Sequence, residues 1–409
     1  MSQRPPVNDL WRSPWWAIAS LAILSLSAAF ALTAYLLRPS SDASLTAPSL
    51  PPPTPAVAPT RAEPTPPTAP LAAPKPPDPA AGLSPEVAAG RCLMIGIPAG
   101  WSPQSPYPLN KVAAGSVILY KQNIPSSKEA LRRLCDNLRA YGQQQWGHKP
   151  IVAIDHEGGS INRMPKLTTY FAPNWELGQP GNAGALVAHE GQVMGAELHE
   201  LGIDLDLAPV VDVLEHPAET HIGVRSYGSD PELVGTLAAD FIGAMRQAGT
   251  ATCAKHWPGY GRLGKDPHKY IAQGNISHEE WLAKYVPPFQ RAVAARVDSV
   301  MSGHIIYSFF DPDKPGSVVP AVYRELRART GFEGPILTDD MEMKSAIDFY
   351  HGDFGRLALE AKKAGADLVL VCWTAQFAID SQKAIAGAIS RGELDVSESL
   401  RLIEQLRRF

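Results

Sequence analysis

Beyond Gly82 the chain alternates short apolar runs with longer stretches in which apolar residues recur at helical spacing. The apolar runs are continuous, which is typical of parallel strands that are buried on both faces. Eight strands are predicted, at Cys92–Ile97, Ser116–Tyr120, Ile151–Asp155, Ile203–Val211, Ala251–His256, Ser299–His304, Ile336–Asp339 and Leu368–Cys372. The helices predicted between them include Ser127–Gln143, Ala183–Leu201, Pro231–Ala248 and His278–Ala295.

This alternation predicts an α/β fold, a (β/α)8 barrel of TIM type. Eight strand–helix units over about 325 residues match that fold in number and size. The alternative is a doubly wound open sheet, which normally carries a glycine-rich phosphate-binding turn after an early strand. The sequence has no such turn, so the closed barrel is favoured.

The N-terminus carries a different pattern. Residues 15–37 form a run of 23 residues without a charge, and an apolar helix needs about 20 residues to cross a bilayer. The apolar core of a cleaved signal peptide is shorter, about 7–15 residues. We therefore expect a transmembrane signal anchor, with a cleaved signal peptide as the alternative.

Arginines on either side of this run suggest its orientation. Arg4 and Arg12 precede it and Arg38 follows it, a weak bias that places residues 1–14 in the cytoplasm. The folded part would then lie on the periplasmic side of an inner membrane, attached by a single span.

Residues 38–82 read as a linker. Fifteen of the 39 prolines fall between Pro39 and Gly82, and large apolar side chains are almost missing. Such a segment favours extended polyproline conformations and cannot form a core. We expect a disordered spacer, and a folded domain over residues 83–409.

Charge and cysteine content narrow the class of protein. The net charge is −4 and no basic block or stripe is present, whereas nucleic-acid binding requires clustered Lys and Arg. The four cysteines are widely spaced and form no C-x-x-C pair. We interpret them as small buried hydrophobic residues, although disulfides stay possible in an oxidising compartment.

A (β/α)8 barrel places its chemistry where strands end and loops begin. Polar residues end four of the predicted strands: Asp155, His156 and Glu157 the third, Lys255 and His256 the fifth, His304 the sixth, and Asp339 and Asp340 the seventh. Packing does not require polar residues at these positions. Their gathering at one end of the barrel predicts an active site.

Two segments carry the candidate chemistry. A glycine-rich loop after the fifth strand presents Asp266 and His268 two residues apart, and a carboxylate beside an imidazole favours a proton donor. Asp339 stands at a strand end, and a carboxylate fixed in this way is what a double-displacement glycosidase would need as its nucleophile. Taken singly, the first segment is equally compatible with a solvated loop, and the Asp339-Asp340 pair is more often a helix cap or an ion pair.

Five motifs in this order resemble glycoside hydrolase family 3, specifically its single-domain β-N-acetylglucosaminidases of the NagZ type: IDHEGGSINRM, DLDLAPVVDV, RSYGSDPELV, KHWPGYGRLGKDPH and TDDMEM. The resemblance covers Leu83–Phe409. It implies that Asp339 is the nucleophile and that His268 is the acid/base, paired with Asp266. It also implies that five residues hold the terminal sugar: Asp155, Arg163, Arg225, Lys255 and His256. No metal and no cofactor are implied.

This chain departs from the family pattern at several loop positions. Tyr260 replaces a usual histidine, and we expect it to shape the loop and not to take part in the chemistry. Pro267 stands where a serine is common, and His156 where a glutamine is usual. These differences bear on loop conformation and leaving-group preference and remove no catalytic group.

The resemblance predicts a retaining exo-β-N-acetylglucosaminidase with a monomeric catalytic domain. The expected substrate is a glycan or muropeptide that ends in N-acetylglucosamine, and the anchor suggests a role in peptidoglycan turnover in the cell envelope. Typical members of this subfamily in Gram-negative bacteria are cytosolic, so the anchor is a feature of this chain.

Three alternatives are weighed. One is a metal-dependent hydrolase that uses His156, His256, Asp266 and His268, although the H-E-x-x-H pattern is missing. Another is a family 3 β-glycosidase of other sugar specificity. The third is a non-catalytic envelope protein that binds peptidoglycan.

Overall fold

The computed structural model describes residues 78–409, apart from 216, 218–220, 261–265, 267 and 268. The chain divides into two units, Met1–Ala73 and Pro74–Phe409. The predicted anchor (15–37) and nearly all of the predicted linker (38–82) lie outside the described residues. Within the described part, no helix is both long enough and apolar enough to cross a membrane.

The sheet is a closed barrel of eight parallel strands in sequence order. The strands are β1 (Leu93–Gly96), β2 (Ser116–Leu119), β3 (Ile151–Ile154), β4 (Leu205–Asp206), β5 (Ala251–Trp257), β6 (Ser299–Ser302), β7 (Ile336–Asp340) and β8 (Leu368–Val371). Since β1 pairs with both β2 and β8, the ring has no edge. The predicted (β/α)8 barrel is confirmed, and the open sheet is excluded.

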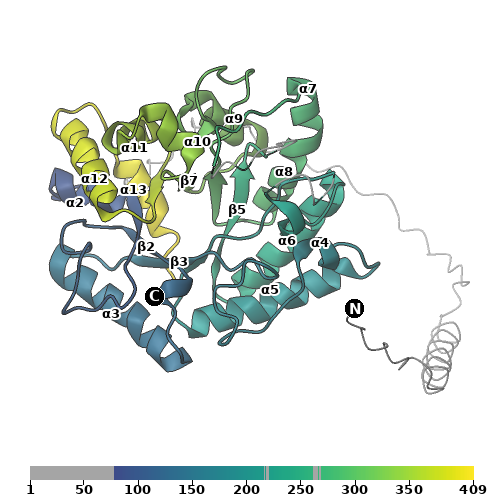
Figure 1. Ribbon diagram of the computed structural model, residues 1–409, viewed down its shortest axis with the longest axis horizontal. Coiled ribbons are helices and arrows are strands. Elements are labelled where there is room, and N and C mark those ends of the chain that lie inside the picture. The colour runs from purple at the N-terminus through teal and green to yellow at the C-terminus, as the bar shows by residue number, and fades with distance from the viewer. Residues whose placement is uncertain (1–77, 216, 218–220, 261–265, 267–268) are drawn as a thin grey trace, which may run out of the picture. The chain divides into compact units, whose positions relative to one another are not determined.

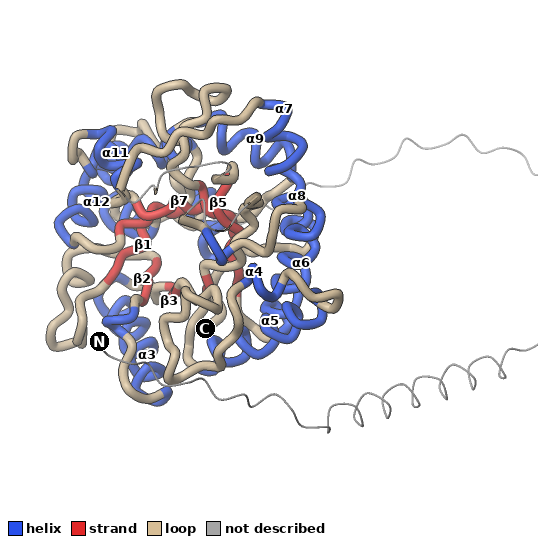
Figure 2. The backbone as a smooth tube through the Cα atoms, turned by 45° about the vertical axis from the view of Figure 1, so that its right-hand side comes forward, coloured by secondary structure: helices blue, strands red, loops and turns tan. Residues whose placement is uncertain are grey.

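Helices surround the barrel (Figures 1 and 2). They are α2 (Pro85–Arg91), α3 (Lys128–Trp146), α4 (Asn174–Leu177), α5 (Ala183–Glu200), α6 (Pro231–Gln247), α7 (His278–Glu280), α8 (Val286–Ala294), α9 (Pro320–Thr330), α10 (Lys344–Ile347), α11 (Phe354–Ala364), α12 (Ala375–Ser390) and α13 (Ser397–Glu404). Local sequence sets their ends. Ser127 caps α3 by accepting from the Ala130 amide, and Gly147 ends that helix in the left-handed conformation.

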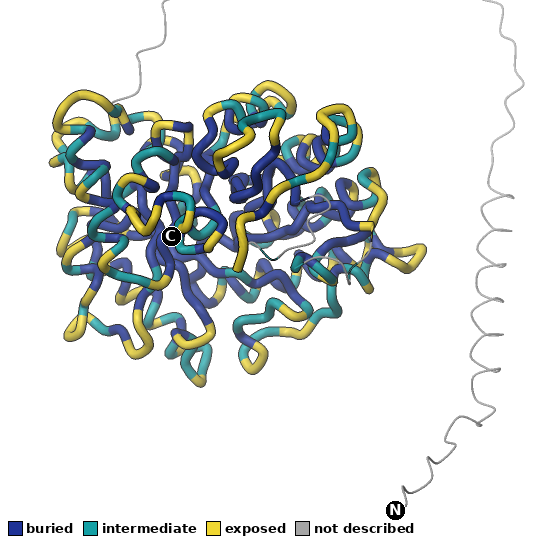
Figure 3. Tube along the Cα trace, turned by 45° about the horizontal axis from the view of Figure 1, so that its top comes forward, coloured by how far each residue is buried: buried dark blue, intermediate teal, exposed yellow. Residues whose placement is uncertain are grey.

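Alternate strand side chains face two different apolar layers, which explains the continuous apolar runs. In β1, Met94 joins the cluster inside the barrel, whereas Leu93 and Ile95 join the cluster between strands and helices. The buried segments form the interior, and exposed segments are concentrated in the outer loops (Figure 3). All four cysteines are buried and free, as expected for small hydrophobic residues.

Two predicted elements are interrupted. The strand predicted at Ile203–Val211 is reduced to Leu205–Asp206. The His156 amide donates to the Asp206 side chain, which interrupts the backbone pairing with β3, and Pro209 has no N–H to donate. The helix predicted at His278–Ala295 is divided by a π-helical turn at Trp281–Tyr285. Two consecutive prolines follow this turn and cannot donate the hydrogen bonds of a regular helix.

Candidate active site

A cavity of about 200 Å³ opens at the carboxyl ends of the strands. Its wall contains Tyr120, Asp155, Glu157, Ile161, Arg163, His221, Arg225, Lys255, His256, Tyr260, Met301, Asp339, Asp340, Met343 and Trp373. All five predicted sugar-binding residues are therefore brought together with Asp339. Strands β3, β5 and β7 position Asp155, Lys255 and Asp339. Asp155 directly follows β3, and the other two lie in the last residues of β5 and β7.

Only Asp266 of the predicted acid/base dyad is among the described residues. Asp266 is described and is not part of the cavity wall. Its carboxylate lies 3.7 Å from the Lys269 ammonium. His268 lies outside the described residues, so its role stays a prediction.

A network of buried charges forms one side of the cavity. The Lys255 ammonium lies 2.9 Å from an Asp155 oxygen and 2.6 Å from a Glu157 oxygen. Glu157 also accepts two hydrogen bonds from the Arg225 guanidinium, at 2.7 and 2.8 Å. Arg163 approaches the second Asp155 oxygen at 3.5 Å. Each of these charged groups lies beside one of opposite sign, which is the condition for burying charges.

The pKa shifts follow from this pairing. Burial alone would raise the pKa of Glu157, but Arg225 and Lys255 hold that pKa well below its ordinary value. Burial alone would lower the pKa of Lys255, but Asp155 and Glu157 hold it above the usual range. Each group is therefore charged at neutral pH, and the side of the cavity presents fixed donors and acceptors.

Glu157 was not among the residues predicted to bind the sugar, and its contacts give Arg225 a second role. The Arg225 guanidinium donates from Nε and Nη2 to the two carboxylate oxygens of Glu157. Arg225 thus contributes to the cavity partly by fixing this carboxylate. The signal in the sequence was the position of Glu157, two residues after the predicted ligand Asp155.

Asp339 is held at both of its carboxylate oxygens. The Tyr260 hydroxyl donates to one oxygen at 3.2 Å, and the Asp340 amide donates to the other at 2.8 Å. Burial and the neighbouring Asp339 raise the pKa of Tyr260 well above its ordinary value, so the hydroxyl stays a donor. Tyr260 was expected to shape the loop, and its hydroxyl also contacts the candidate nucleophile.

A buried aspartate orients both His256 and the Tyr260 backbone. Asp212 lies 2.7 Å from His256 Nδ1 and accepts from the Tyr260 amide at 2.8 Å. An imidazole whose Nδ1 is bound to a carboxylate presents its Nε2 in a fixed direction. The sequence gave only a weak sign of this residue, a single acid that interrupts the apolar run Val210–Val213.

His156 and His304 also follow strands but serve the framework. His156 is buried, contacts Thr168 at 3.3 Å, and has its pKa lowered to about 4 by burial and by Arg163. His304 bridges Ser317 and the Asp340 carbonyl at 2.7 and 2.9 Å. Neither belongs to the cavity wall. Among the described residues, no group of three or more His, Cys, Asp or Glu is arranged to hold a metal ion.

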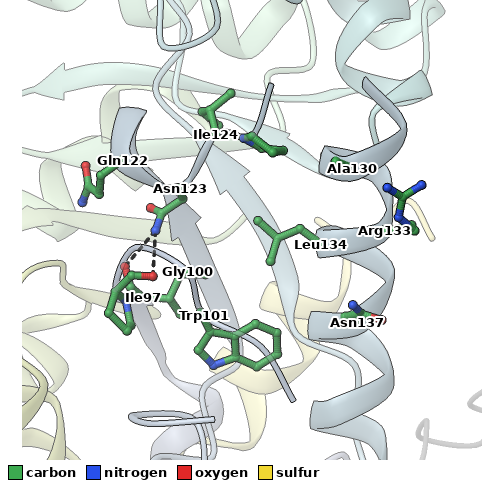
Figure 4. A pocket seen from close by; sticks show the side chains of 12 residues that line it. Ile97, Gly100, Trp101, Gln122, Asn123, Ile124, Ala130, Arg133, Leu134 and Asn137 are labelled. Atoms are coloured by element: carbon green, nitrogen blue, oxygen red, sulfur yellow. Dashed lines mark hydrogen bonds between the residues drawn. The ribbon is translucent and has the colours of Figure 1, made fainter. Parts of the chain in front are cut away.

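A second cavity, of about 400 Å³, lies between the loop after β1 and helix α3 (Figure 4). Trp101, Leu134 and Asn137 contribute to its wall. Asn123 shapes one edge by donating to the carbonyls of Ile97 and Pro98. Arg133 is its single titratable residue, so this cavity has no acid, base or nucleophile for a reaction.

The comparisons with known proteins agree with the barrel fold. Residues 101–407 match the model of the glycosyl hydrolase family 3 N-terminal domain. The chain belongs to glycoside hydrolase family 3. As a family 3 member it is a glycosidase, and its cavity is where the sugar chemistry of a barrel enzyme is expected.

Relatives of this family 3 chain have been named and solved. A beta-hexosaminidase of Methylococcus capsulatus is 34% identical over 264 residues, which are 64% of this chain and 76% of that protein. The structure of a family 3 beta-N-acetylglucosaminidase from Paenibacillus sp. has a TM-score of 0.73 at 28% identity, covering 79% of this chain and 61% of that chain. NagZ from Neisseria gonorrhoeae has a TM-score of 0.63 at 25% identity, covering 77% of this chain and 98% of that one.

Proposed function

We propose that this family 3 glycosidase is a retaining exo-β-N-acetylglucosaminidase. The observation that carries the proposal is the position of Asp339. Its carboxylate is fixed by Tyr260 and Asp340 in the wall of a cavity whose other side is a network of paired charges. The names of the relatives support the class of sugar, because they include a beta-hexosaminidase and a beta-N-acetylglucosaminidase.

In the proposed reaction Asp339 attacks the anomeric carbon and forms a covalent glycosyl-enzyme while the leaving group departs. The resemblance assigns His268 to protonate the departing oxygen, with Asp266 as its partner. His268 then takes a proton from water, and the water releases the sugar with its original configuration. The two hydrogen bonds to Asp339 orient its carboxylate for this attack.

The inner side of the cavity fits a terminal sugar. Asp155, Lys255 and His256 present hydrogen-bond donors and acceptors that suit hydroxyl groups and an acetamido group. Because Lys255 and Asp155 are already paired, their positions are set before the sugar binds. The proposed natural substrates are peptidoglycan fragments that end in β-linked N-acetylglucosamine.

The proposed site of action is the cell envelope. Residues 15–37 would anchor the chain in the inner membrane, and the linker would hold a monomeric catalytic domain on the periplasmic side. Digestion of the domain by protease added to spheroplasts would support this orientation. Protection until the membrane is dissolved would contradict it.

The test of the function is a substrate panel with the full-length protein. Nitrophenyl β-N-acetylglucosaminide should be cleaved at least about 100-fold faster than the corresponding glucoside, a difference of about 2.7 kcal/mol in transition-state binding. Proton NMR should detect the β anomer as the first product. A preference for the glucoside would indicate another family 3 specificity, and the α anomer as first product would exclude a retaining mechanism.

A further inference from the structure

Trp373 is the most exposed side chain in the wall of the active-site cavity. It is 59% exposed, whereas Lys255 and His256 in the same wall are buried. One face of its indole is stacked on Tyr120, with ring centroids 4.2 Å apart and planes 27° from parallel. Since Tyr120 covers that face, the exposed area must come from the opposite face and the edges of the ring.

The backbone under Trp373 is held firmly. Glu342 accepts from the amides of Trp373 and Thr374 at 2.7 and 2.8 Å, and from the Thr374 hydroxyl at 2.6 Å. The end of β1 also packs tightly against the backbone before Trp373. A Cβ added to Gly96 would lie only 1.8 Å from the Cys372 carbonyl oxygen. Trp373 is therefore an aromatic surface built into the end of β8.

The stack continues inward to the charged side of the cavity. The Arg163 guanidinium lies over the ring of Tyr120, on which Trp373 is stacked, 5.7 Å from the ring centroid. Arg163 in turn pairs with Asp155. The cavity thus changes from charged and buried at Asp155 to aromatic and exposed at Trp373. In an exo-acting enzyme the terminal sugar takes the buried end, so the leaving group must lie toward the exposed end.

A further cavity, of about 230 Å³, adjoins Trp373 on this side. Tyr107, 45% exposed, is also in its wall. Its remaining wall is apolar or backbone apart from the Gln122 amide: Gly96, Ile97, Pro98, Pro108, Cys372 and Ala375. It shares Ile97, Pro98 and Gln122 with the 400 Å³ cavity of Figure 4. The three cavities therefore follow one another from Asp339 outward.

We propose that Trp373 and the cavity between it and Tyr107 form the leaving-group subsite, which binds a sugar ring of the departing glycan. The inference rests on the proposed function, in that Asp339 and the charged network hold the terminal sugar. A pyranose ring has an apolar C–H face that packs on an aromatic face, while its hydroxyl edge is satisfied by water or a single amide such as Gln122. The 400 Å³ cavity gives room for a longer glycan, so the preferred substrate class is an oligosaccharide and not a simple alkyl glycoside.

The experiment compares two substrates of the full-length protein. One is the β-1,4-linked disaccharide of N-acetylglucosamine, whose leaving group is a sugar. The other is N-acetyl-β-glucosaminyl fluoride, whose leaving group is too small to reach Trp373. Trp373→Ala should lower kcat/KM on the disaccharide about tenfold, a loss of about 1.4 kcal/mol, while fluoride hydrolysis should stay within about twofold. Trp373→Phe should recover most of the loss.

Two further variants control the comparison. Tyr107→Ala, in the wall of the 230 Å³ cavity, should show the same selectivity with a smaller loss. Tyr170→Ala removes an aromatic ring that is 67% exposed and lines none of the three cavities, and it should change neither rate.

The outcomes separate the two proposals. If the wild-type protein cleaves both substrates and Trp373→Ala loses equally on both, or on neither, the subsite is refuted and the proposed function stands. If the wild-type protein cleaves neither substrate, the proposed function fails and the subsite fails with it.

Discussion

The active-site cavity has two contrasting sides. On the side formed by β3 and β5, Lys255, Asp155 and Glu157 are paired and largely removed from water. On the side formed by β8, Trp373 offers an uncharged ring that is more than half exposed. The first side is costly to alter, since each charge depends on its partners. The second should tolerate loss of its side chain with little effect on the fold, because the ring is more than half exposed.

The largest expected effect is at Asp339. Asp339→Asn keeps the size of the side chain and removes the attacking carboxylate, so turnover of nitrophenyl β-N-acetylglucosaminide should fall by on the order of 10⁴-fold or more. Steady-state rates measure this loss, and an unchanged thermal midpoint would show that the fold is intact. A variant that keeps a tenth of the activity would show that Asp339 is not the nucleophile.

The next effect concerns stability. Lys255→Met removes the cation that Asp155 and Glu157 share. Each carboxylate keeps one arginine nearby, so the loss should lie at the lower end of the range for a broken buried pair, about 3 kcal/mol. Urea unfolding of the variant and of Trp373→Ala should give clearly different free energies, with the tryptophan variant within about 1 kcal/mol of the wild type. Equal losses in the two variants would remove the contrast between the two sides.

Tyr260→Phe tests the hydrogen bond to Asp339. The attacking carboxylate would lose one of its two orienting donors, and misplacement of a reacting group can cost about 100-fold, so kcat should fall by about 10- to 100-fold. A hydrogen bond to a charged group also contributes about 1.5–3 kcal/mol to stability, so the free energy of unfolding should fall by no more than that. Tyr307→Phe is a matched control, because this buried hydroxyl donates to the Gly259 carbonyl and lies outside the cavity wall. If both variants keep the wild-type kcat, Tyr260 has only the structural role first expected for it.

The smallest effect compares two buried glutamates. Glu190 on α5 has no hydrogen-bond partner for either carboxylate oxygen among the described residues, and burial raises its pKa to about 8. The folded protein therefore holds a proton that the unfolded chain releases near its ordinary pKa of about 4.3. Stability should fall as the pH rises from about 4.5 to 8, because the folded state binds more protons over that window.

Glu190→Gln should abolish this part of the pH dependence. At pH 8 the variant should be more stable than the wild type by about 1 kcal/mol or more. Urea unfolding at pH 5 and pH 8 measures this difference. Glu157→Gln should behave in the opposite way and lose stability at both values, since Arg225 and Lys255 keep Glu157 ionised. Identical responses in the two variants would contradict the different pairing of these side chains.

Much of the fold could be predicted because it depends on periodic features. All eight strands were found within a few residues, apart from the strand at Leu205–Asp206. That strand is short because the Asp206 side chain takes the hydrogen bond of the His156 amide and because Pro209 has no N–H. A pattern of apolar residues does not show which hydrogen bonds the backbone makes. The same limitation applied to the helix broken before Pro287.

The site could be predicted only in part, for a related reason. Residues at strand ends, such as Asp155, Lys255 and Asp339, follow from the topology of the barrel and from the family motifs. Tyr260 could not be assigned, because its partner Asp339 is 79 residues away and nothing local marks the pair. Trp373 was missed because a tryptophan after an apolar run resembles the end of a core strand.

The way in which Glu342 holds the end of β8 has an evolutionary consequence. It accepts from the backbone amides of residues 373 and 374, and therefore bonds to no atom that depends on which side chain stands at 373. Any residue placed there would inherit the same location beside the reacting bond. A single codon change could thus retune which glycans are preferred while the machinery for cleaving them is left as it is.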